Sequence, residues 1–245
     1  MSLESQIADL VTATNGLIAT FNTKKAGIDS AVSAAIAAIP QARKTFYVHQ
    51  LDGLDTNDGT LAAPLKTIDR ALLTTPYGGI CIIYLLADYA LTTQVLGFEG
   101  RFLEIRSYDP ANQRALRPAY YTASGGQTIL SGFSSIAGAA IALREVGLVL
   151  PTQIGFTPPT TINNCFVRTI NAGSSPLLAM KMSFTTVTEV AGATALLIGA
   201  DGSAITLGAQ DTTFPSGFAG RYVRGAAAGV NPATLSNVLT NLSTL

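Results

Sequence analysis

The hydrophobic positions of the chain follow two different periods. Over residues 1–39, apolar side chains recur at alternating steps of four and three residues, the heptad spacing of helices that associate along an apolar seam. The seam consists of Leu3, Ile7, Leu10, Thr14, Leu17, Phe21, Lys24 and Ile28, and after two steps of four it continues with Val32, Ala35 and Ile39. Ser2 as N-cap and Pro40 as terminator predict a helical segment over residues 1–40.

This helix needs a partner, because one narrow apolar stripe does not stabilise a helix in isolation. One alternative is a trimeric coiled-coil stalk made by copies of the chain. The other is a helix, or a hairpin bent at Gly27, that lies against the rest of its own chain. We favour the stalk, in which the candidate contacts between copies are Leu3, Ile7, Leu10, Leu17, Phe21, Ile28, Val32 and Ile39.

From Gly79 to about Gly208 the pattern changes to short apolar runs separated by Gly, Pro, Asn and Ser, which predicts a mainly β domain over residues 41–214. Several runs start roughly 20 residues apart, a spacing typical of solenoid coils, although a two-sheet sandwich fits the same strand content. The predicted strands are residues 81–86, 102–107, 141–150, 165–170, 178–187 and 196–207.

The segment 46–73 joins a short strand, a turn and a short amphipathic helix. Asn57, Asp58 and Gly59 favour a turn, since the side chains of the first two bond nearby backbone and glycine tolerates positive φ. Pro64 favours a helix start, after which one apolar face forms. That face consists of Leu65, Ile68, Ala71 and Leu72. Such a helix can cover the open end of a stack of strands, and the alternative is a βα crossover in an α/β domain.

These residues carry a resemblance. The segment resembles the N-terminal cap of pectate-lyase-like proteins and bacteriophage tailspikes. The matching elements are Tyr47-Val48, Gly53, Asp55, Asn57-Asp58-Gly59-Thr60, Pro64 to Ile68 and Ala71-Leu72. The resemblance implies a mainly β protein with a small right-handed parallel β-helix-like body. To this the sequence adds the N-terminal helical stalk and a short C-terminal helix. The resemblance also implies a homotrimer.

Residues 215–245 form a Gly- and Ala-rich passage followed by a predicted closing helix. Asn231 is a suitable N-cap and Pro232 a suitable first helical residue. The apolar face of this helix would consist of Leu235, Val238, Leu239, Leu242 and Leu245. It must pack against its own domain, against other copies or against another protein, and Leu235, Leu239 and Leu242 are candidate contacts between copies.

Charged residues make up only 12% of the 245 residues and the formal net charge is +0. Sparse charge is consistent with a surface covered by other subunits, and neutrality argues against a nucleic-acid partner. The apolar run 80–87 is far shorter than the roughly 20 residues of a membrane-spanning helix, so no membrane insertion is expected. Neither a secretory signal nor a cofactor is expected.

The residues that could perform chemistry are few. Cys81 and Cys165 lie in apolar strands, where a thiol behaves as a small hydrophobe, so we expect neither a disulfide nor a metal site. His49 has no nucleophile near it in the sequence, and the acidic cluster around Asp55 does not fit the EF-hand pattern. Cleavage of a polysaccharide would need two carboxylates at matched positions of neighbouring coils. The acids of the strand region do not show such matched positions, so no catalytic residue is assigned and enzymatic activity stays uncertain. These acids are Glu99, Glu104, Asp109, Glu145, Glu189 and Asp201.

A recognition surface is predicted in residues 107–127, which read as a long loop between two strands. Tyrosine and arginine side chains suit sugar rings, anionic groups and protein hot spots. The candidate ligand-binding residues are Tyr108, Arg114, Arg117, Tyr120 and Tyr121. The alternative is that the loop packs over the side of the domain or against a neighbouring subunit.

Together these features predict a structural virion protein, a trimeric component similar to a tail fibre or tailspike that is assembled in the host cytoplasm. It would act in host attachment or as an adaptor for receptor-binding proteins. Its expected partners are copies of itself, other phage tail or baseplate proteins, and a host surface glycan or protein. The alternatives are a head fibre or capsid decoration protein and, from another class, a polysaccharide-degrading enzyme.

Overall fold

The computed structural model describes residues 2–136, 138–157, 159–170 and 175–245, without the side chains of residues 38–41. The chain forms two compact units, Met1–Ala42 and Arg43–Leu245. The segment 215–245 belongs to the second unit. We call the second unit the body.

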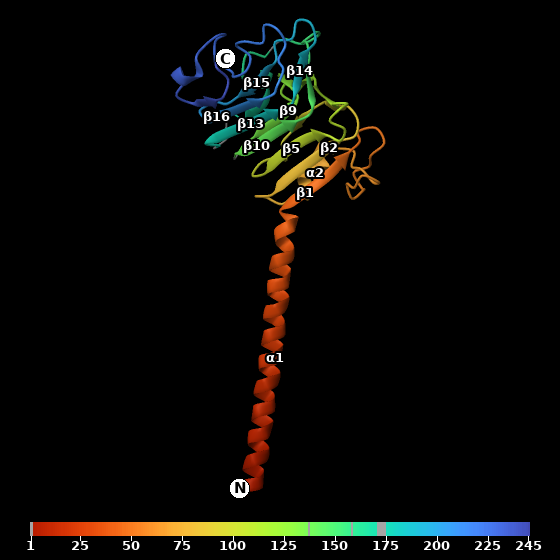
Figure 1. Ribbon diagram of the computed structural model, residues 1–245, viewed down its shortest axis with the longest axis vertical. Coiled ribbons are helices and arrows are strands. Elements are labelled where there is room, and N and C mark those ends of the chain that lie inside the picture. The colour runs from red at the N-terminus through yellow and green to blue at the C-terminus, as the bar shows by residue number, and fades with distance from the viewer. Residues whose placement is uncertain (1, 137, 158, 171–174) are drawn as a thin grey trace. The chain divides into compact units, whose positions relative to one another are not determined.

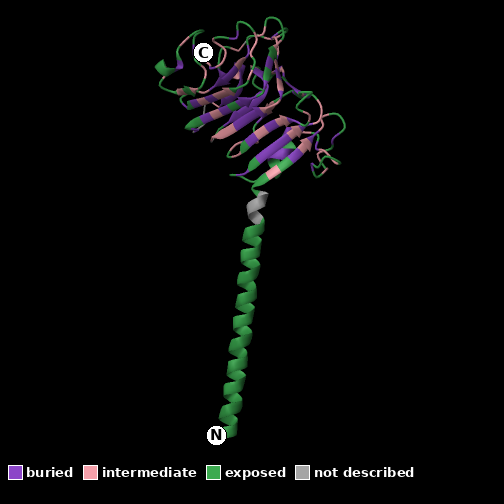
Figure 2. Cartoon of the chain, in the orientation of Figure 1, coloured by how far each residue is buried: buried purple, intermediate pink, exposed green. Residues whose placement is uncertain are grey.

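The first unit is the helix α1, Leu3–Gln41. It confirms the predicted helix, and it continues one residue past Pro40. At 1.5 Å per residue its 39 residues extend over about 58 Å. The hairpin alternative is wrong, because the helix passes through Gly27 without a break. Every described side chain from residue 2 to residue 37 is exposed (Figure 2).

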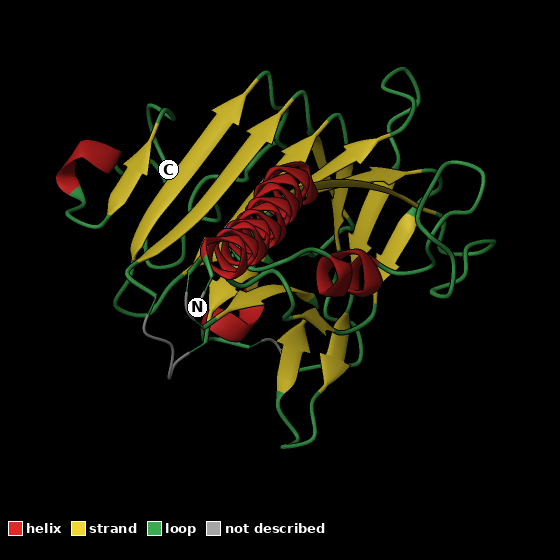
Figure 3. Ribbon diagram, turned by 90° about the horizontal axis from the view of Figure 1, so that it is seen from below, coloured by secondary structure: helices red, strands yellow, loops and turns green. Residues whose placement is uncertain are grey.

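The body is mainly β, as predicted (Figure 1 and Figure 3). Three of its sheets are parallel. Sheet A has the order β1-β2-β5-β10-β13-β16-β17, with bounds Arg43–Val48, Ile80–Leu85, Phe102–Ser107, Ala139–Arg144, Leu177–Ser183, Ala204–Gln210 and Val238–Thr240. Sheet B has the order β14-β11-β6-β3, with bounds Thr186–Glu189, Gly147–Leu150, Ala115–Pro118 and Tyr89–Leu91. Sheet C has the order β15-β12-β9-β4, with bounds Leu196–Gly199, Cys165–Thr169, Gly132–Ser135 and Gln94–Val95.

The chain visits the three sheets in rotation. From β2 it passes to β3 in sheet B and β4 in sheet C, then returns to sheet A at β5, and it repeats this circuit through β6 and β9, β11 and β12, and β14 and β15. In the last circuit, bridges from Thr213 to Thr186 and from Val223 to Ile198 continue sheets B and C before β17 rejoins sheet A. The circuit from Ile80 to its partner Phe102 has the predicted spacing, and the next is longer because it contains the antiparallel pair β7, Tyr120–Thr122, and β8, Thr128–Leu130.

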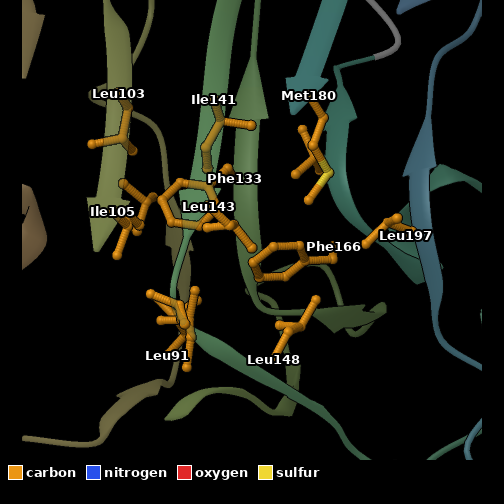
Figure 4. Close-up of a cluster of buried hydrophobic side chains, with 14 of the residues drawn as sticks. Leu91, Leu103, Ile105, Phe133, Ile141, Leu143, Leu148, Phe166, Met180 and Leu197 are labelled. Atoms are coloured by element: carbon orange, nitrogen blue, oxygen red, sulfur yellow. The ribbon is translucent and has the colours of Figure 1, made fainter. Parts of the chain in front are cut away.

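Alternating side chains of each strand point into one shared core. In sheet A the inward positions stack in register, as in the row Cys81, Leu103, Ile141, Met180 and Leu207. Figure 4 shows residues of all three sheets meeting in this core. At its centre the rings of Phe98, Phe133 and Phe166 form edge-to-face pairs with centroids 5.7 and 5.5 Å apart. Stacked circuits therefore bury each other's apolar faces.

Three of the predicted strands each turn out to be two strands in different sheets. Residues 141–150 and 178–187 are interrupted at Glu145 and Phe184, which adopt left-handed φ values of 55° and 52°. Asp211, with φ 47°, holds the equivalent place after β16, since Ser183 and Gln210 are register partners. The third case, 196–207, breaks at the turn around Gly202. These corners turn the chain out of one sheet and into the next.

The predicted turn and helix of the segment 46–73 are present. Gly59 has φ 81°, and a β-bridge joins Val48 to Leu65. The helix α2, Ile68–Thr74, starts later than predicted because Thr67, not the Pro64 region, caps it by accepting a hydrogen bond from the Arg70 amide. Ile68, Ala71 and Leu72 are fully buried and belong to the core cluster, so α2 covers apolar side chains of the first circuits.

The predicted C-terminal helix is wrong. Asn231 and Pro232 do cap a helical turn, but it is only the 3₁₀ helix η2, Pro232–Thr234. The chain then enters β17, which pairs in parallel with β16. The free edge of β16 offers unpaired backbone groups to an extended segment, and this pairing outweighs the helical pattern of the leucines. Leu245 is buried against the same core.

Candidate recognition surface

The segment 107–127 is not the long loop that was predicted. It contains β6 and β7, so strands interrupt it at residues 115–118 and 120–122. Arg117 points outward from β6 and pairs with Asp88 across β3 and β6, with 3.0 Å between Nη2 and Oδ2. Arg114 is half-buried, and its backbone amide donates to the Ser107 hydroxyl. These two arginines therefore belong to β6 and the residue before it, in sheet B, and do not share one surface with all three tyrosines.

The prediction that Tyr120 lies at the surface is wrong. Its side chain is buried, and its hydroxyl donates to Oδ1 of Asn164 over 2.6 Å. Burial raises the pKa of Tyr120 to about 12. Tyr121, the next residue of β7, points to the opposite face and is half-buried. The strand alternation separates two neighbours that the sequence analysis had placed together.

Tyr108 is the member of the predicted set that does lie in an aromatic surface. It follows β5 and meets Tyr47 of β1 and Tyr84 of β2, with ring centroids 5.7 and 6.5 Å away. Tyr47 and Tyr84 are register partners and stack at 5.4 Å. We call these three residues the tyrosine cluster. Tyr108 is 47% exposed and the other two are half-buried, so the cluster is open to solvent on the outer face of sheet A.

Charged groups adjoin the tyrosine cluster. Arg106 is the register partner of Tyr84, and its guanidinium carbon lies 5.9 Å from the Tyr84 ring centroid. Its Nε donates to Glu104 over 2.6 Å, and this hydrogen bond raises the pKa of Arg106. Arg144 follows in the same row on β10. Aromatic faces beside held guanidinium groups suit a sugar or an anionic group.

Tyr47 and Tyr84 could not be predicted as part of this surface, because they lie far from Tyr108 along the chain. Both are the next-to-last residue of their strands and lie between two buried residues. That shared position was the only signal in the sequence. It becomes informative only when the register of β1 against β2 is known.

The acids considered for catalysis have partners in the described structure. Glu189 and Asp201 are held by Arg221 and Arg224, and Glu145 lies 3.5 Å from Arg144. Glu99 accepts from the Ile136 amide over 2.6 Å, while Asp109 accepts from Ala111 and Asn112. In sheet A the register partners of Glu104 are Ile82 and Ala142. The geometry thus gives these carboxylates structural contacts.

The acidic turn near Asp55 is likewise built from hydrogen bonds. Asp55 accepts from the amides of Lys66 and Thr67 and from the Thr67 hydroxyl, at 2.9 to 3.1 Å. Asn57 donates to the Pro64 carbonyl, and Asp58 accepts from the Thr60 amide and hydroxyl, which lowers the pKa of Asp58. The side chains of Asp55, Asn57 and Asp58 therefore hold the turn together by hydrogen bonds within it.

The residues predicted as contacts between copies divide into three groups. On α1, Leu3, Ile7, Leu10, Leu17, Phe21, Ile28 and Val32 are exposed, and the side chain of Ile39 lies outside the described residues. In the body, Leu235 and Leu242 pack against the core of their own chain. Leu239 is 69% exposed and lines a cavity of about 510 Å³ with Lys181 and Gly208.

Within the described residues, no helix combines the length and the hydrophobicity that crossing a membrane requires. Comparison of the chain with family models, with characterised proteins and with solved structures found no match.

Proposed function

We propose that this protein is a structural component of a virion, a homotrimer similar to a phage tail fibre or tailspike. In this proposal α1 forms a three-stranded stalk, and the body is a right-handed parallel β-helix. The protein attaches the particle to a host surface glycan or protein, or it links other tail or baseplate proteins to larger receptor-binding proteins. Its location on the virion is the tail, with a head fibre or capsid decoration protein as the alternative.

The observation that carries the proposal is the exposed seam of α1. Leu17 and Phe21 are 70% and 68% exposed, and the other described apolar members are exposed by half or more. Fully burying one such side chain contributes roughly 1.5–3 kcal/mol. Association of helices along the seam would bury these side chains and gain that free energy, whereas in a single copy they stay exposed to solvent. The number of three copies comes from the resemblance to tailspikes.

The circuits of the body support the β-helix. Parallel strands joined by crossovers are right-handed in nearly all known cases. A chain that rotates through three parallel sheets and stacks each circuit on the last has the connectivity of a solenoid. α2 covers apolar residues near β1, the first strand of sheet A, in the manner of the cap that the sequence resembles.

The outer face of sheet A offers a second contact between copies. Ile80, Phe102, Ala140 and Ala179 form one row by register, and Ile80 and Phe102 are each 38% exposed. Leu177 on β13 adds an apolar side chain that is 45% exposed. Contiguous exposed apolar side chains of this kind are typical of protein interfaces. The tyrosine cluster lies two rows away and remains available to a ligand.

Attachment is consistent with a trimer because three copies present three identical sites. Weak contacts at each site then add up through avidity when the host surface carries many copies of the receptor. The tyrosine cluster and Arg106 supply the kind of side chains that such a contact uses.

The test is the native mass of the full-length protein and of a seam variant. We expect about 76 kDa, three times the 25.4 kDa of one chain. Leu10→Glu with Leu17→Glu places charge in the seam and should give monomers. Thr12→Glu with Ala19→Glu adds the same charge at the same spacing on the opposite face of α1 and should stay trimeric.

A full-length protein that is monomeric at micromolar concentration would overturn the fibre. Equal behaviour of the two double variants would show that the seam is not the contact. Labelling of intact virions with an antibody to the body separates the tail location from the head location. Release of reducing ends from a host polysaccharide would instead favour the depolymerase alternative.

A further inference from the structure

The outer side of sheet C carries a polar groove that the tyrosine cluster does not include. It lies between the β7–β8 hairpin and the 3₁₀ helix η1, Ile162–Asn164, and has a volume of about 440 Å³. Its polar lining consists of Gln127, Thr128, Thr157, Thr160, Thr161 and Asn163. The amides of Asn163 and Gln127 meet across the groove at 3.4 Å. We call this the hairpin groove.

A second cavity of about 220 Å³ continues from the hairpin groove, since Gln127 and Asn163 line both. Its other walls include Gln94, Arg168 and the apolar side chains of Ile129 and Ile162. The combined site thus has hydroxyl and amide groups at its mouth and an arginine at its inner end.

Arg168 is a buried cation without a carboxylate partner. Its side chain is on β12, and the residue is only 1% exposed. Its Nη1 donates to the carbonyls of Leu130 and Cys165 over 2.8 and 2.7 Å. Among the described residues no Asp or Glu lies within ion-pair distance of it. Burial lowers the pKa of Arg168 to about 10, so the guanidinium stays charged at neutral pH.

Gln94 links this charge to the cavity. With its amide oxygen turned toward Arg168, Gln94 accepts from Nη2 and Nε of the guanidinium and from the Ser134 hydroxyl. Its amide nitrogen is then left to donate elsewhere, and Gln94 lines the cavity. The inner end of the site therefore combines a neutral donor with an uncompensated positive charge, which attracts an anion more strongly in a poorly solvated place than in water.

We propose that the hairpin groove binds an acidic sugar, with the ring hydroxyls against the threonine and amide side chains and the carboxylate at the Arg168 end. A polyhydroxylated ring can contact several of the six polar side chains of the groove, which a simple inorganic anion cannot reach at once. Arg168 acts as a positioning residue through its charge and through Gln94. The proposal rests on the attachment function, for which it names the class of glycan.

The test uses the full-length protein with methyl glucuronide and methyl glucoside, two sugars that differ only at C6. Ligand-detected NMR titration should show the glucuronide binding at least about tenfold more tightly, the factor expected of one charge-assisted hydrogen bond. Asn163→Ala should weaken binding of both sugars. Asn237→Ala, which changes the same residue type at an exposed site outside the groove, should leave both affinities unchanged.

Gln94→Glu is the decisive variant. It is nearly isosteric and gives Arg168 a carboxylate partner, so the body should stay folded while the preference for the glucuronide disappears. Arg168→Met is the less safe variant, because it leaves the Leu130 and Cys165 carbonyls without their donor. Equal affinity of the wild type for the two sugars, binding of neither, or an unchanged preference in a folded Gln94→Glu protein would each overturn the proposal.

The native mass of the same samples separates the two proposals. A trimer that does not distinguish the sugars keeps the fibre and overturns the acidic-sugar site. A monomer that prefers the glucuronide keeps the site and overturns the fibre.

Discussion

The helix α1 and the body use the same kinds of apolar residue with opposite results. Phe21 on α1 is 68% exposed, whereas Phe133 and Phe166 in the body are fully buried. A helix satisfies its own backbone hydrogen bonds but can bury its apolar stripe only against another element. Circuits of parallel strands bury their inward side chains against each other within one chain. The body therefore buries its apolar side chains within one chain, whereas the apolar stripe of α1 stays exposed in a single copy.

Removing residues 1–42 should have the largest effect, because it leaves the body without α1. The body has its own core, so we expect it to keep its unfolding free energy while the native mass falls to that of one chain. Denaturant unfolding and native mass measurement check both parts. A shortened chain that does not fold would show that the body depends on the stalk, and a shortened chain that remains a trimer would move the main contact to the outer face of sheet A.

Phe133→Ala should cost about 3–5 kcal/mol of unfolding free energy, because it opens a cavity in the middle of the Phe98–Phe133–Phe166 stack. Phe21→Ala removes the same atoms from α1 and should change the stability of the body by less than about 0.5 kcal/mol. Urea unfolding followed by circular dichroism measures both. Similar costs for the two variants would contradict the separation of the two regions.

High pH should destabilise the body. Burial raises the pKa of Tyr89 and Tyr120 from 10.0 to about 12. A raised pKa means that the folded state keeps the proton up to a higher pH than the unfolded state does. The stability that each raised pKa contributes is present below pH 10 and is lost as the pH rises through about 12, by up to about 3 kcal/mol for each tyrosine.

Measurement of the unfolding free energy between about pH 9 and pH 12 checks this loss. Tyr120→Phe removes one of the groups that titrate in this range, so it should lower stability at neutral pH, through the lost bond to Asn164, but show a smaller further loss at high pH. An identical alkaline loss in the variant and the wild type would contradict the assignment to Tyr120.

The smallest expected effect concerns the corner at Phe184. Because φ is 52° there, Phe184→Gly should be more stable than Phe184→Ala by about 1 kcal/mol, since only glycine adopts this conformation without strain. At Thr188, an exposed position within β14, the order of glycine and alanine should reverse. Thermal unfolding of the four variants makes the comparison, and the same order at both positions would argue against a strained corner.

Part of the candidate site could be predicted from the sequence. Tyr108 was selected because aromatic and arginine residues gather around it, and the structure places it beside Tyr47 and Tyr84. Tyr120 was selected for the same reason and is buried, since alternation along β7 turns it inward. The hairpin groove could not be predicted, because Arg168 and Gln94 come from strands of different circuits.

The sequence alone determined the local elements whose signals are short-range. The heptad steps predicted α1, and the alternation of apolar and other residues predicted strands such as β5 with the right bounds. The turn at Gly59 and a short helix after it also follow from nearby residues. Each of these depends on backbone preference and on the burial pattern of a few neighbours along the chain.

The tertiary structure alone decided where those elements pair. The corners at Glu145, Phe184 and Asp211 carry no glycine, and they adopt left-handed φ because the stacked circuits above and below hold them there. The leucines near the C-terminus have helical spacing, yet residues 238–240 became a strand because the edge of β16 was open. Such choices depend on hydrogen bonds and core contacts between residues of different circuits, and a single sequence does not record which circuits meet.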